Sequence, residues 1–424
     1  MYHGMRKSSP RKCLSLCTAG ALALGMAAGL AGCGAQSESG AESKEIVIWT
    51  QTSGPDAEAQ QKTFKAYNDT KPEYTVKMVS MKKETFNAKL ATAARSGKDV
   101  PDIAVVASEE VPTWHSQGVL VPWGDSLDGT HVNEDAYVPA AWKVGEVDGE
   151  RYGIPGTIGT WISYYNKDLI DKYAPGALDD GIVSFDELHA AAPKAKADGV
   201  YVYANAWSFQ NYDNLYLQMG GQWQDDQGNI SVDNDISTAV FKQLQQLNRD
   251  GYMVPDGEDA DKAFLNGKLM VIPQGTWMLS TFDDASFEWG ESLVPQWDVN
   301  NIVQCSGTDQ YVIIKSAQER SEAKMKGMAH LMEWLQSNQL EMLKSGANPS
   351  AIAMLDNDEY SAMPQSFLLK NPEMFNAITI ITTPGLSYVN TEIDARAWDM
   401  ITGKADIAET MHTIQQTVEQ KLAQ

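Results

Sequence analysis

Cysteine is scarce in this chain, with only four residues among 424. Cys13 and Cys17 lie in an N-terminal hydrophobic run, and the other two are Cys33 and Cys305. If the N-terminal run is removed and Cys33 is modified, Cys305 remains alone and no internal disulfide can form. The fold must then be stabilised by an ordinary core, and about 390 residues suffice for two domains. We expect Cys305 itself to be a small buried hydrophobic residue.

The sequence also lacks the motifs of several enzyme and metal-binding classes. It contains no G-x-S-x-G elbow, no Walker loop and no G-x-G-x-x-G opening a helix. No histidine after residue 32 has a second His or Cys at metal-ligand spacing. These histidines are His115, His131, His189, His330 and His412. We therefore expect no metal, no cofactor and no enzymatic activity of these classes.

Basic residues are outnumbered by acidic ones, 33 against 56. Residues 1–32 hold four of the basic residues and none of the acidic ones, so the remainder has 29 basic residues and a formal charge of −27. Such a charge repels nucleic acid and anionic lipid, and it excludes nucleic-acid binding. A neutral ligand such as a sugar is indifferent to it.

The N-terminus has the plan of a signal peptide. A basic stretch, 6–12, precedes an uncharged run over 13–32, and a small, polar segment follows over 34–43. The sequence Leu30-Ala31-Gly32-Cys33 resembles the bacterial lipobox, which implies cleavage after residue 32, lipidation of Cys33 and a flexible tether over 33–43. The alternatives are a transmembrane span, for which the run is barely long enough, and cleavage without lipidation.

Strand and helix patterns alternate through the first part of the mature chain. We predict strands over 45–49, 74–79 and 102–106, and helices over 56–68 and 84–96. Two later helices, 320–337 and 406–423, carry apolar residues at steps of three or four. The alternation predicts an α/β fold with a parallel sheet covered on both faces, whose ligands bind beyond the carboxyl ends of the strands.

Four segments, in this order behind a lipobox, resemble the family 1 extracellular solute-binding proteins of bacterial ABC importers, the maltose-binding type. They are 100–106 with 114–123, 152–155 with 163–169, 264–272 with 275–277, and 397–403 with the closing helix. The resemblance implies a two-lobed, type II periplasmic-binding-protein-like fold with a hinge. We place lobe one at 44–155 and 305–350, and lobe two at 156–304 and 351–424.

The same resemblance implies the function. It predicts a monomeric, lipid-anchored protein on the outer face of the cytoplasmic membrane. There it captures a carbohydrate and delivers it to the membrane permease of an ABC importer. Several candidate aromatic residues and the lack of a basic cluster favour a neutral oligosaccharide over a phosphorylated ligand.

A sugar site needs aromatic plates for the C–H faces of the ring and polar planar groups for its hydroxyls. Most tryptophans of a folded chain belong to the core, so position must select among them. The resemblance points to Trp161, Trp207, Trp223 and Trp277 in lobe two, to Thr157 in the crossing between the lobes, to Gln51, Thr52, Ser108 and Glu109 at strand ends of lobe one, and to Ser306, Gly307 and Asp309 in another crossing. We expect ligand to dock on the lobe-two aromatics before lobe one closes through Gln51 and Glu109.

Two other classes of function stay open at this point. An anchored glycoside hydrolase also needs aromatic residues and carboxylates around a sugar, and among 56 acidic residues a suitable pair can always be drawn. For Glu109 a solvated carboxylate at a helix start is an equal alternative. A structural envelope protein usually has internal repeats, and none is found.

Overall fold

The computed structural model describes residues 43–423 apart from residue 53, and the structural statements below concern this part of the chain. The predicted signal peptide, Cys33 and the predicted tether up to residue 42 lie outside the described residues.

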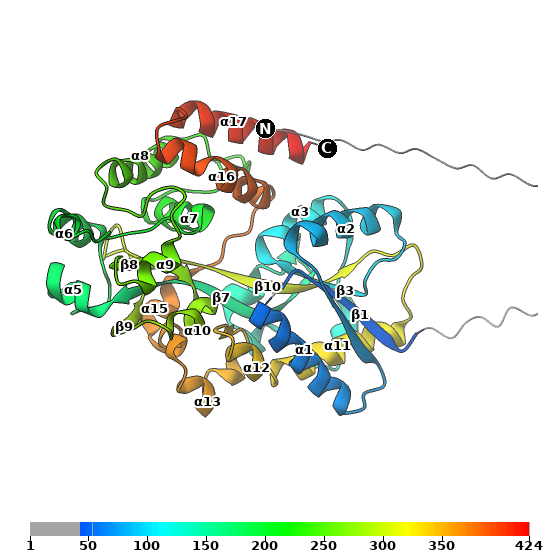
Figure 1. The fold of residues 1–424 in the computed structure, drawn as a ribbon. Coiled ribbons are helices and arrows are strands. Elements are labelled where there is room, and N and C mark those ends of the chain that lie inside the picture. The colour runs from blue at the N-terminus through cyan, green and yellow to red at the C-terminus, as the bar shows by residue number, and fades with distance from the viewer. Residues whose placement is uncertain (1–42, 53, 424) are drawn as a thin grey trace, which may run out of the picture. The chain divides into compact units, whose positions relative to one another are not determined.

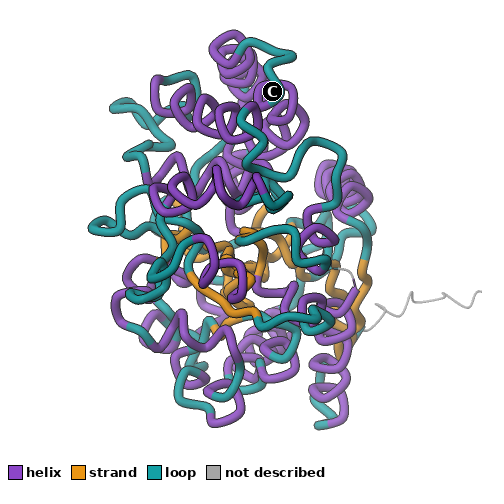
Figure 2. The backbone as a smooth tube through the Cα atoms, turned by 60° about the vertical axis from the view of Figure 1, so that its left-hand side comes forward, coloured by secondary structure: helices purple, strands orange, loops and turns teal. Residues whose placement is uncertain are grey.

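Helices surround the strands (Figure 2). The strands are β1 (Glu45–Thr50), β2 (Thr75–Ser80), β3 (Ile103–Ala107), β4 (Leu120–Val121), β5 (Glu146–Val147), β6 (Glu150–Arg151), β7 (Gly153–Asn166), β8 (Val271–Gly275), β9 (Trp289–Ser292), β10 (Gln304–Ile314), β11 (Asn348–Pro349) and β12 (Ile378–Thr379). The α-helices are α1 (Gly54–Asp69), α2 (Lys83–Ser96), α3 (Val111–Ser116), α4 (Pro139–Lys143), α5 (Lys167–Tyr173), α6 (Phe185–Ala197), α7 (Ser208–Gln218), α8 (Asp235–Arg249), α9 (Ala260–Leu265), α10 (Leu279–Phe282), α11 (Glu322–Gln336), α12 (Leu340–Leu343), α13 (Asp358–Ser361), α14 (Phe367–Lys370), α15 (Pro372–Ala377), α16 (Leu386–Ile401) and α17 (Ile407–Leu422).

The elements predicted from periodicity are confirmed, with boundaries that differ by no more than two residues. Local capping explains where several of them begin and end. The Ser321 side chain accepts a hydrogen bond from the Lys324 amide at the start of α11, and the Asp406 side chain does the same for the Glu409 amide at the start of α17. Gly97 adopts a left-handed φ of 63° and ends α2.

Strands β1, β2 and β3 are parallel, and helices cover them on both faces. Side chains alternate along β3: Ile103 and Val105 belong to one hydrophobic core, and Ala104 and Val106 to another. Figure 1 shows α2 and α3 on one side of β1 and β3, and α1 and α11 on the other. This explains why β3 is a continuous apolar run.

The sheet is mixed, which corrects the prediction of a parallel sheet. Its order is β11-β7-β10-β3-β1-β2, and β10 is antiparallel to both β3 and β7. The prediction was wrong because β10 is distant from the alternating segment in sequence, so local periodicity does not report its direction. The β10–β7 register shifts between Thr308 and Gln310. At this irregularity the single β10 residue Asp309 stands against two residues of β7.

The long strands β7 and β10 link this region to a second group of elements. The first half of β7 pairs with β10, whereas its second half, from Trp161 to Asn166, pairs with β8 and β9. A second large core lies among α6, α7, α8, α16 and α17, with Phe241, Ile393 and Met411 fully buried in it. Helix α16 packs against both α7 and α8 (Figure 1).

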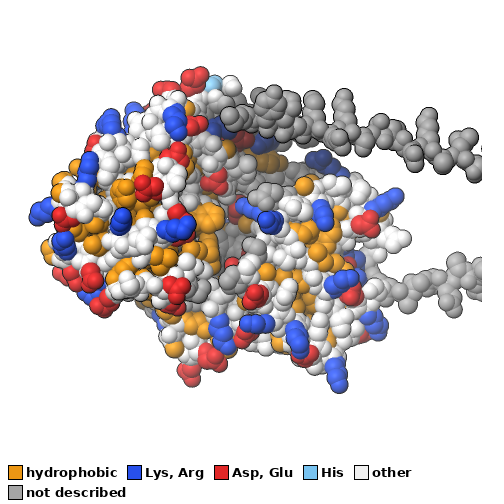
Figure 3. Space-filling model, viewed as in Figure 1, with side chains coloured by type: hydrophobic (Ala, Val, Ile, Leu, Met, Phe, Trp, Pro, Cys, Tyr) orange, Lys and Arg blue, Asp and Glu red, His pale blue; other side chains and the backbone are white. Residues whose placement is uncertain are grey.

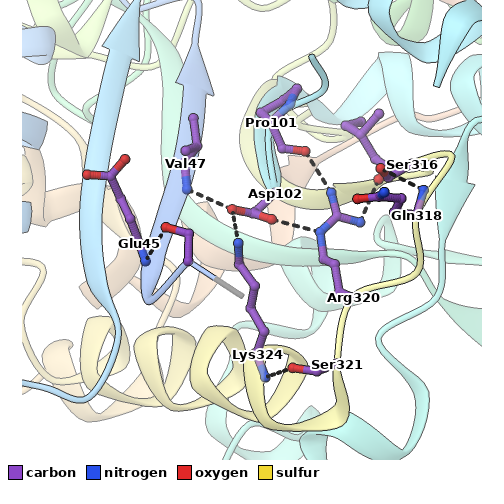
Figure 4. Close-up of polar contacts among 11 residues, drawn as sticks. Glu45, Val47, Pro101, Asp102, Ser316, Gln318, Arg320, Ser321 and Lys324 are labelled. Carbon is purple, nitrogen blue, oxygen red and sulfur yellow. Dashed lines mark hydrogen bonds and ion pairs between the residues drawn. The ribbon is translucent and has the colours of Figure 1, made fainter. Parts of the chain in front are cut away.

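A buried ion cluster connects the residue before β3 with the N-terminal end of α11 and the segment before it (Figure 4). Asp102 accepts from Arg320 Nε at 2.8 Å and from Lys324 Nζ at 2.8 Å, and all three side chains are about one-tenth exposed. Its Oδ2 also accepts from the Val47 amide at 2.9 Å. Arg320 further donates to the carbonyls of Ile314 and Pro101. One carboxylate thus ties together three segments that are far apart in the sequence.

In the described part of the chain, none of the helices has the length and apolar character needed to span a bilayer.

Candidate ligand-binding site

A cavity of about 520 Å³ lies where β1, β3, β7, β10 and α7 meet. This volume falls in the range of small-molecule sites, about 300–1,000 Å³. Ten of the twelve predicted site residues line it. They are Gln51, Thr52, Ser108, Glu109, Thr157, Trp161, Trp277, Ser306, Gly307 and Asp309.

One wall is built from strand ends. Gln51 and Thr52 follow β1, and Ser108 and Glu109 follow β3. Because β1 and β3 are parallel neighbours, their carboxyl ends meet at one edge of the sheet. The Thr52 hydroxyl donates to Gln60 Oε1 at 2.8 Å, which fixes this loop against α1. Asp309 joins the wall from β10.

Two tryptophans of the second group of elements also line the cavity, and their rings contact a third indole ring. Trp161 lies at the start of the β7 segment that pairs with β8, and its ring centroid is 4.9 Å from that of Trp277 at an interplanar angle of 83°. The Trp207 ring is 5.5 Å from Trp161 and 6.4 Å from Trp277. At Gly275 a Cβ would overlap the Trp277 ring, so the absence of a side chain there lets the indole lie against the end of β8.

Trp207 does not line the main cavity but the one beside it. It is 42% exposed and contributes to an adjoining cavity of about 330 Å³. Its Nε1 donates to Gln274 Oε1 at 2.7 Å, and Gln274 Nε2 donates to Asp261 Oδ1 at 2.8 Å. These bonds fix the orientation of an exposed indole. Met278 lines both cavities, so the two spaces are neighbours.

The structure places Trp223 in the core, which corrects its prediction as a cavity residue. It is 4% exposed, and its ring centroid lies 4.8 Å from that of Tyr216 and 5.8 Å from that of Tyr212. Its Nε1 donates to Asp213 Oδ1 at 3.0 Å, so Trp223 supports a cavity residue from behind. Sequence position showed that Trp223 follows α7 but not which way its side chain points.

Several lining residues escaped sequence reasoning. Phe209, Gln210 and Asp213 come from the same surface of α7, where positions three and four apart lie side by side. Asp56 lies in the first turn of α1. The spacing within α7 was the only available signal, and it became useful only once the helix was oriented. Cys305 is 3% exposed, as predicted for a buried small residue, but it also borders the cavity.

The cavity carboxylates are held in an unfavourable environment. Burial, together with the nearby charges of Asp56 and Glu109, raises the pKa of Asp309 to about 7. Burial likewise raises the pKa of Asp213 to about 7, while hydrogen bonds from Cys305 and Trp223 oppose the shift.

Four buried side-chain atoms of described lining residues lack a hydrogen-bond partner. They are Gln51 Oε1, Gln210 Oε1, Thr276 Oγ1 and Ser306 Oγ.

We expect the ligand-free protein to be more stable at mildly acidic than at alkaline pH. Burial is the main cause that raises the pKa to about 7 for Glu110, Asp213, Glu291 and Asp309. Unfolded carboxyls titrate near ~4, so between about pH 4 and about pH 7 the folded state binds more protons and stability falls as pH rises. Carboxylates whose pKa is lowered, such as Asp198 by its hydrogen bond from Lys172, act only at lower pH.

Thermal unfolding without ligand at about pH 5.5 and about pH 8 tests this expectation. The melting temperature should be several degrees higher at the lower pH, and Asp309→Asn should reduce the difference. An equal or higher melting temperature at the higher pH would contradict the assigned pKa directions.

The comparisons with known proteins agree with this geometry. Residues 62–368 match the family described as bacterial extracellular solute-binding protein. Because the match spans more than half of the chain, the chain belongs to this family of solute-binding proteins. The family is defined by binding rather than by catalysis, so the glycoside hydrolase alternative receives no support.

Two relatives and one solved structure illustrate the similarity. The arabinooligosaccharide-binding protein of Halalkalibacterium halodurans is 23% identical over 274 residues, which cover 60% of this chain and 59% of that protein, under two thirds of its length. The galactooligosaccharide-binding protein of Bacillus subtilis is 23% identical over 436 residues, 92% of this chain and 93% of that protein. The crystal structure of the GacH receptor of Streptomyces glaucescens, solved unliganded and with acarbose, has a TM-score of 0.72 at 18% identity and covers 89% of this chain and 98% of its own.

The structural likeness shows the fold. The predicted two-lobed α/β fold of type II periplasmic-binding proteins is confirmed by it. In the described residues, no group of three or more His, Cys, Asp or Glu side chains is arranged to hold a metal ion.

Proposed function

We propose that this protein captures an oligosaccharide in the 520 Å³ cavity and delivers it to the permease of an ABC importer. The observation that carries the proposal is the pairing of the Trp161 and Trp277 rings with carboxylates and amides from strand ends around one space. Flat apolar plates suit the C–H faces of sugar rings, and planar polar groups suit hydroxyls. The saccharide-binding relatives and the family support the same conclusion.

We assign the walls to two lobes with the boundaries predicted from the sequence, 44–155 with 305–350 and 156–304 with 351–424. The separate cores support this division, because the cores around β1–β3 draw their buried residues from 46–154 and 311–335, whereas the core around α7 and α16 draws them from 170–271 and 386–418. In this assignment β7 and β10 are the hinge strands, since each pairs with elements of both groups.

Closure of the lobes follows from differential contact. A ligand that touches only one lobe cannot shift the balance between open and closed forms. Moving that balance from 1:99 to 99:1 takes ~5.5 kcal/mol of preference for the closed form. In our proposal the saccharide stacks first on Trp161 and Trp277 of lobe two, and Gln51 and Glu109 of lobe one then complete the contacts. The permease recognises the closed form, and the protein acts as a monomer.

We further propose that the protein is exported by the signal peptide 1–32 and anchored to the outer face of the cytoplasmic membrane through lipidated Cys33. The resemblance of residues 30–33 to the lipobox supports this anchor. Cys33→Ser should move the protein from the membrane fraction to the medium when the full chain is expressed in a bacterium with this export route. Retention of the variant in the membrane fraction would contradict the anchor.

A saccharide panel tests the binding function. Purified protein is screened by thermal shift against mono- and oligosaccharides of different linkage, and positive compounds are measured by calorimetry. At least one oligosaccharide should raise the melting temperature and be recovered chemically unchanged. If no saccharide of the panel binds, the proposed function is wrong.

Trp277→Ala should weaken binding of the saccharide found in this panel by ~1–3 kcal/mol while the protein stays folded. The reason is loss of a stacking surface at a side chain that borders the cavity. Trp297 offers a matched control, because it is 40% exposed and does not line the cavity. Trp297→Ala should leave the dissociation constant unchanged. A large fall in melting temperature for Trp277→Ala, with binding retained, would instead make Trp277 a core residue.

A further inference from the structure

The charged side chains that line the cavity all have one sign. Asp56, Glu109, Asp213 and Asp309 border it, and no Lys, Arg or His does so among the described lining residues. The outer surface is different, because Lys and Arg side chains lie interspersed with Asp and Glu side chains on the face shown in Figure 3. Exposed ion pairs also form between described residues, such as Lys44 with Glu73 at 3.0 Å. The cavity is therefore a place where negative charge is left without a protein cation.

The protein itself does little to stabilise these carboxylates. Among the described residues nothing donates a hydrogen bond to the Asp309 carboxylate, and the charges acting on it, those of Asp56 and Glu109, are both negative. Within the described part of the chain, Asp213 accepts hydrogen bonds only from the Cys305 thiol and the Trp223 indole, and it also experiences the charge of Glu109. Asp213 and Asp309 are partly buried, and a carboxylate that loses water without gaining a cationic partner is costly to keep ionised. A ligand that brings a positive charge would offset that cost.

Unpaired acceptors in the cavity also indicate a ligand that donates hydrogen bonds. Among the residues that the structure describes, no donor reaches the buried amide oxygens of Gln51 and Gln210, and both residues line the cavity. An amide oxygen can only accept, so these positions need a donor from the ligand. The hydroxyl of Thr276, a residue with 0% exposure, also has no partner there.

The indole rings complete the chemistry. Trp161 and Trp277 line the same cavity as the carboxylates. Tryptophan is the aromatic side chain that attracts a cation most strongly. Carboxylates, amide acceptors and indole faces are together the groups that receive an ammonium ion.

We infer that the oligosaccharide taken by this site carries an amino group, as an amino sugar or an amine-linked sugar analogue does. This inference rests on the proposed saccharide-binding function and names the class of saccharide. A neutral hydroxyl can donate one hydrogen bond to a carboxylate but leaves its charge uncompensated. A protonated amine donates up to three hydrogen bonds and brings the missing charge. The inference replaces the expectation of a neutral ligand, and it disfavours phosphorylated or acidic sugars.

The adjoining cavity is also lined by acidic residues. Glu258, Asp259 and Asp261 line it beside the exposed Trp207, and no basic residue does so among the described ones. Asp259 is paired with Lys262, whereas Asp261 meets only the neutral amide of Gln274. A ligand long enough to pass Trp207 meets more negative charge there, which favours an oligomer with more than one amine.

Matched saccharides test the inference by calorimetry on the mature protein at low ionic strength. Each set shares one skeleton and differs only in the group at C2: glucosamine oligomers against N-acetylglucosamine and glucose oligomers of the same β-1,4 linkage and length, and galactosamine against galactose. In the set that binds most tightly, the amine-bearing member should bind at least ~10-fold more tightly than its neutral counterparts, a difference of ~1.4 kcal/mol.

Variants show whether the carboxylates cause the preference. Asp309→Asn and Asp213→Asn should each reduce the ratio of amine to neutral affinity, because the shape of the side chain is kept and its charge is lost. Asp226 is exposed and lies outside the cavity, so Asp226→Asn should leave the ratio unchanged.

The outcomes separate this inference from the proposed function. If a neutral saccharide binds and its amine-bearing partner binds no more tightly, the inference is wrong and the saccharide-binding function stands. If amines bind preferentially but both Asn variants keep the full ratio, the assignment to these carboxylates is wrong. If no saccharide of any set binds, both the function and the inference fall.

Discussion

Replacing Asp102 with alanine should lower the free energy of unfolding by ~3–5 kcal/mol, the usual cost of breaking a buried ion pair by removing one partner. Asp102 is the only acidic group that faces both Arg320 and Lys324 among the described residues, at 2.8 Å from each. Its loss leaves two cations, each with about one-tenth of its side chain exposed, without a counter-charge. The Val47 amide also loses its acceptor.

Urea unfolding of the ligand-free protein measures this effect. Asp171→Ala is the control, because Asp171 pairs with Lys167 on an exposed helix face and exposed pairs contribute little. Ligand affinity per folded molecule should be unchanged in both variants, since neither residue lines the cavity. A free energy of unfolding for Asp102→Ala within ~1 kcal/mol of the parent would show that the ion cluster contributes little to stability.

Replacing Trp223 with alanine should also cost ~3–5 kcal/mol of stability, because a large buried side chain is removed from a packed core. Trp223→Ala should therefore lower stability, whereas Trp277→Ala should lower affinity and leave stability unchanged. Trp223→Phe keeps part of the packing against Tyr216 and loses the hydrogen bond to Asp213. We expect it to be less destabilising than the alanine variant.

Denaturation and calorimetry on the same samples distinguish core from site. If Trp223→Ala stays as stable as the parent and loses affinity, Trp223 is a ligand contact, as the sequence suggested, and the core assignment is wrong. Loss of stability with the affinity of the folded fraction largely kept supports the core assignment.

Local patterns predicted local structure well. The periodic apolar residues of 406–423 predicted a helix that the structure has at Ile407–Leu422, and the apolar run at 102–106 predicted a strand found at Ile103–Ala107. The direction of β10 could not be predicted in this way. Strand polarity depends on partners far away in sequence, and β10 returns next to β3 about 200 residues later.

The candidate site was predicted from resemblance to a family rather than from local sequence patterns. Resemblance to the family pointed to strand ends and crossings, and ten of the residues chosen there line one cavity. It did not find Asp56 or Asp213, because acidic residues are common in this chain and nothing in the sequence tells a cavity carboxylate from a surface one. The sign of charge within the cavity is likewise a property of the assembled walls. It became visible only when α7, β10 and the strand ends were seen together.

We propose that one saccharide is held by two lobes that close around it. Small-angle scattering on the mature protein, with and without a saccharide at a concentration that calorimetry shows to be saturating, measures this closure. The radius of gyration should be smaller in the bound state. An unchanged radius of gyration at full occupancy would rule out closure, and with it the proposed recognition of the closed form by the permease.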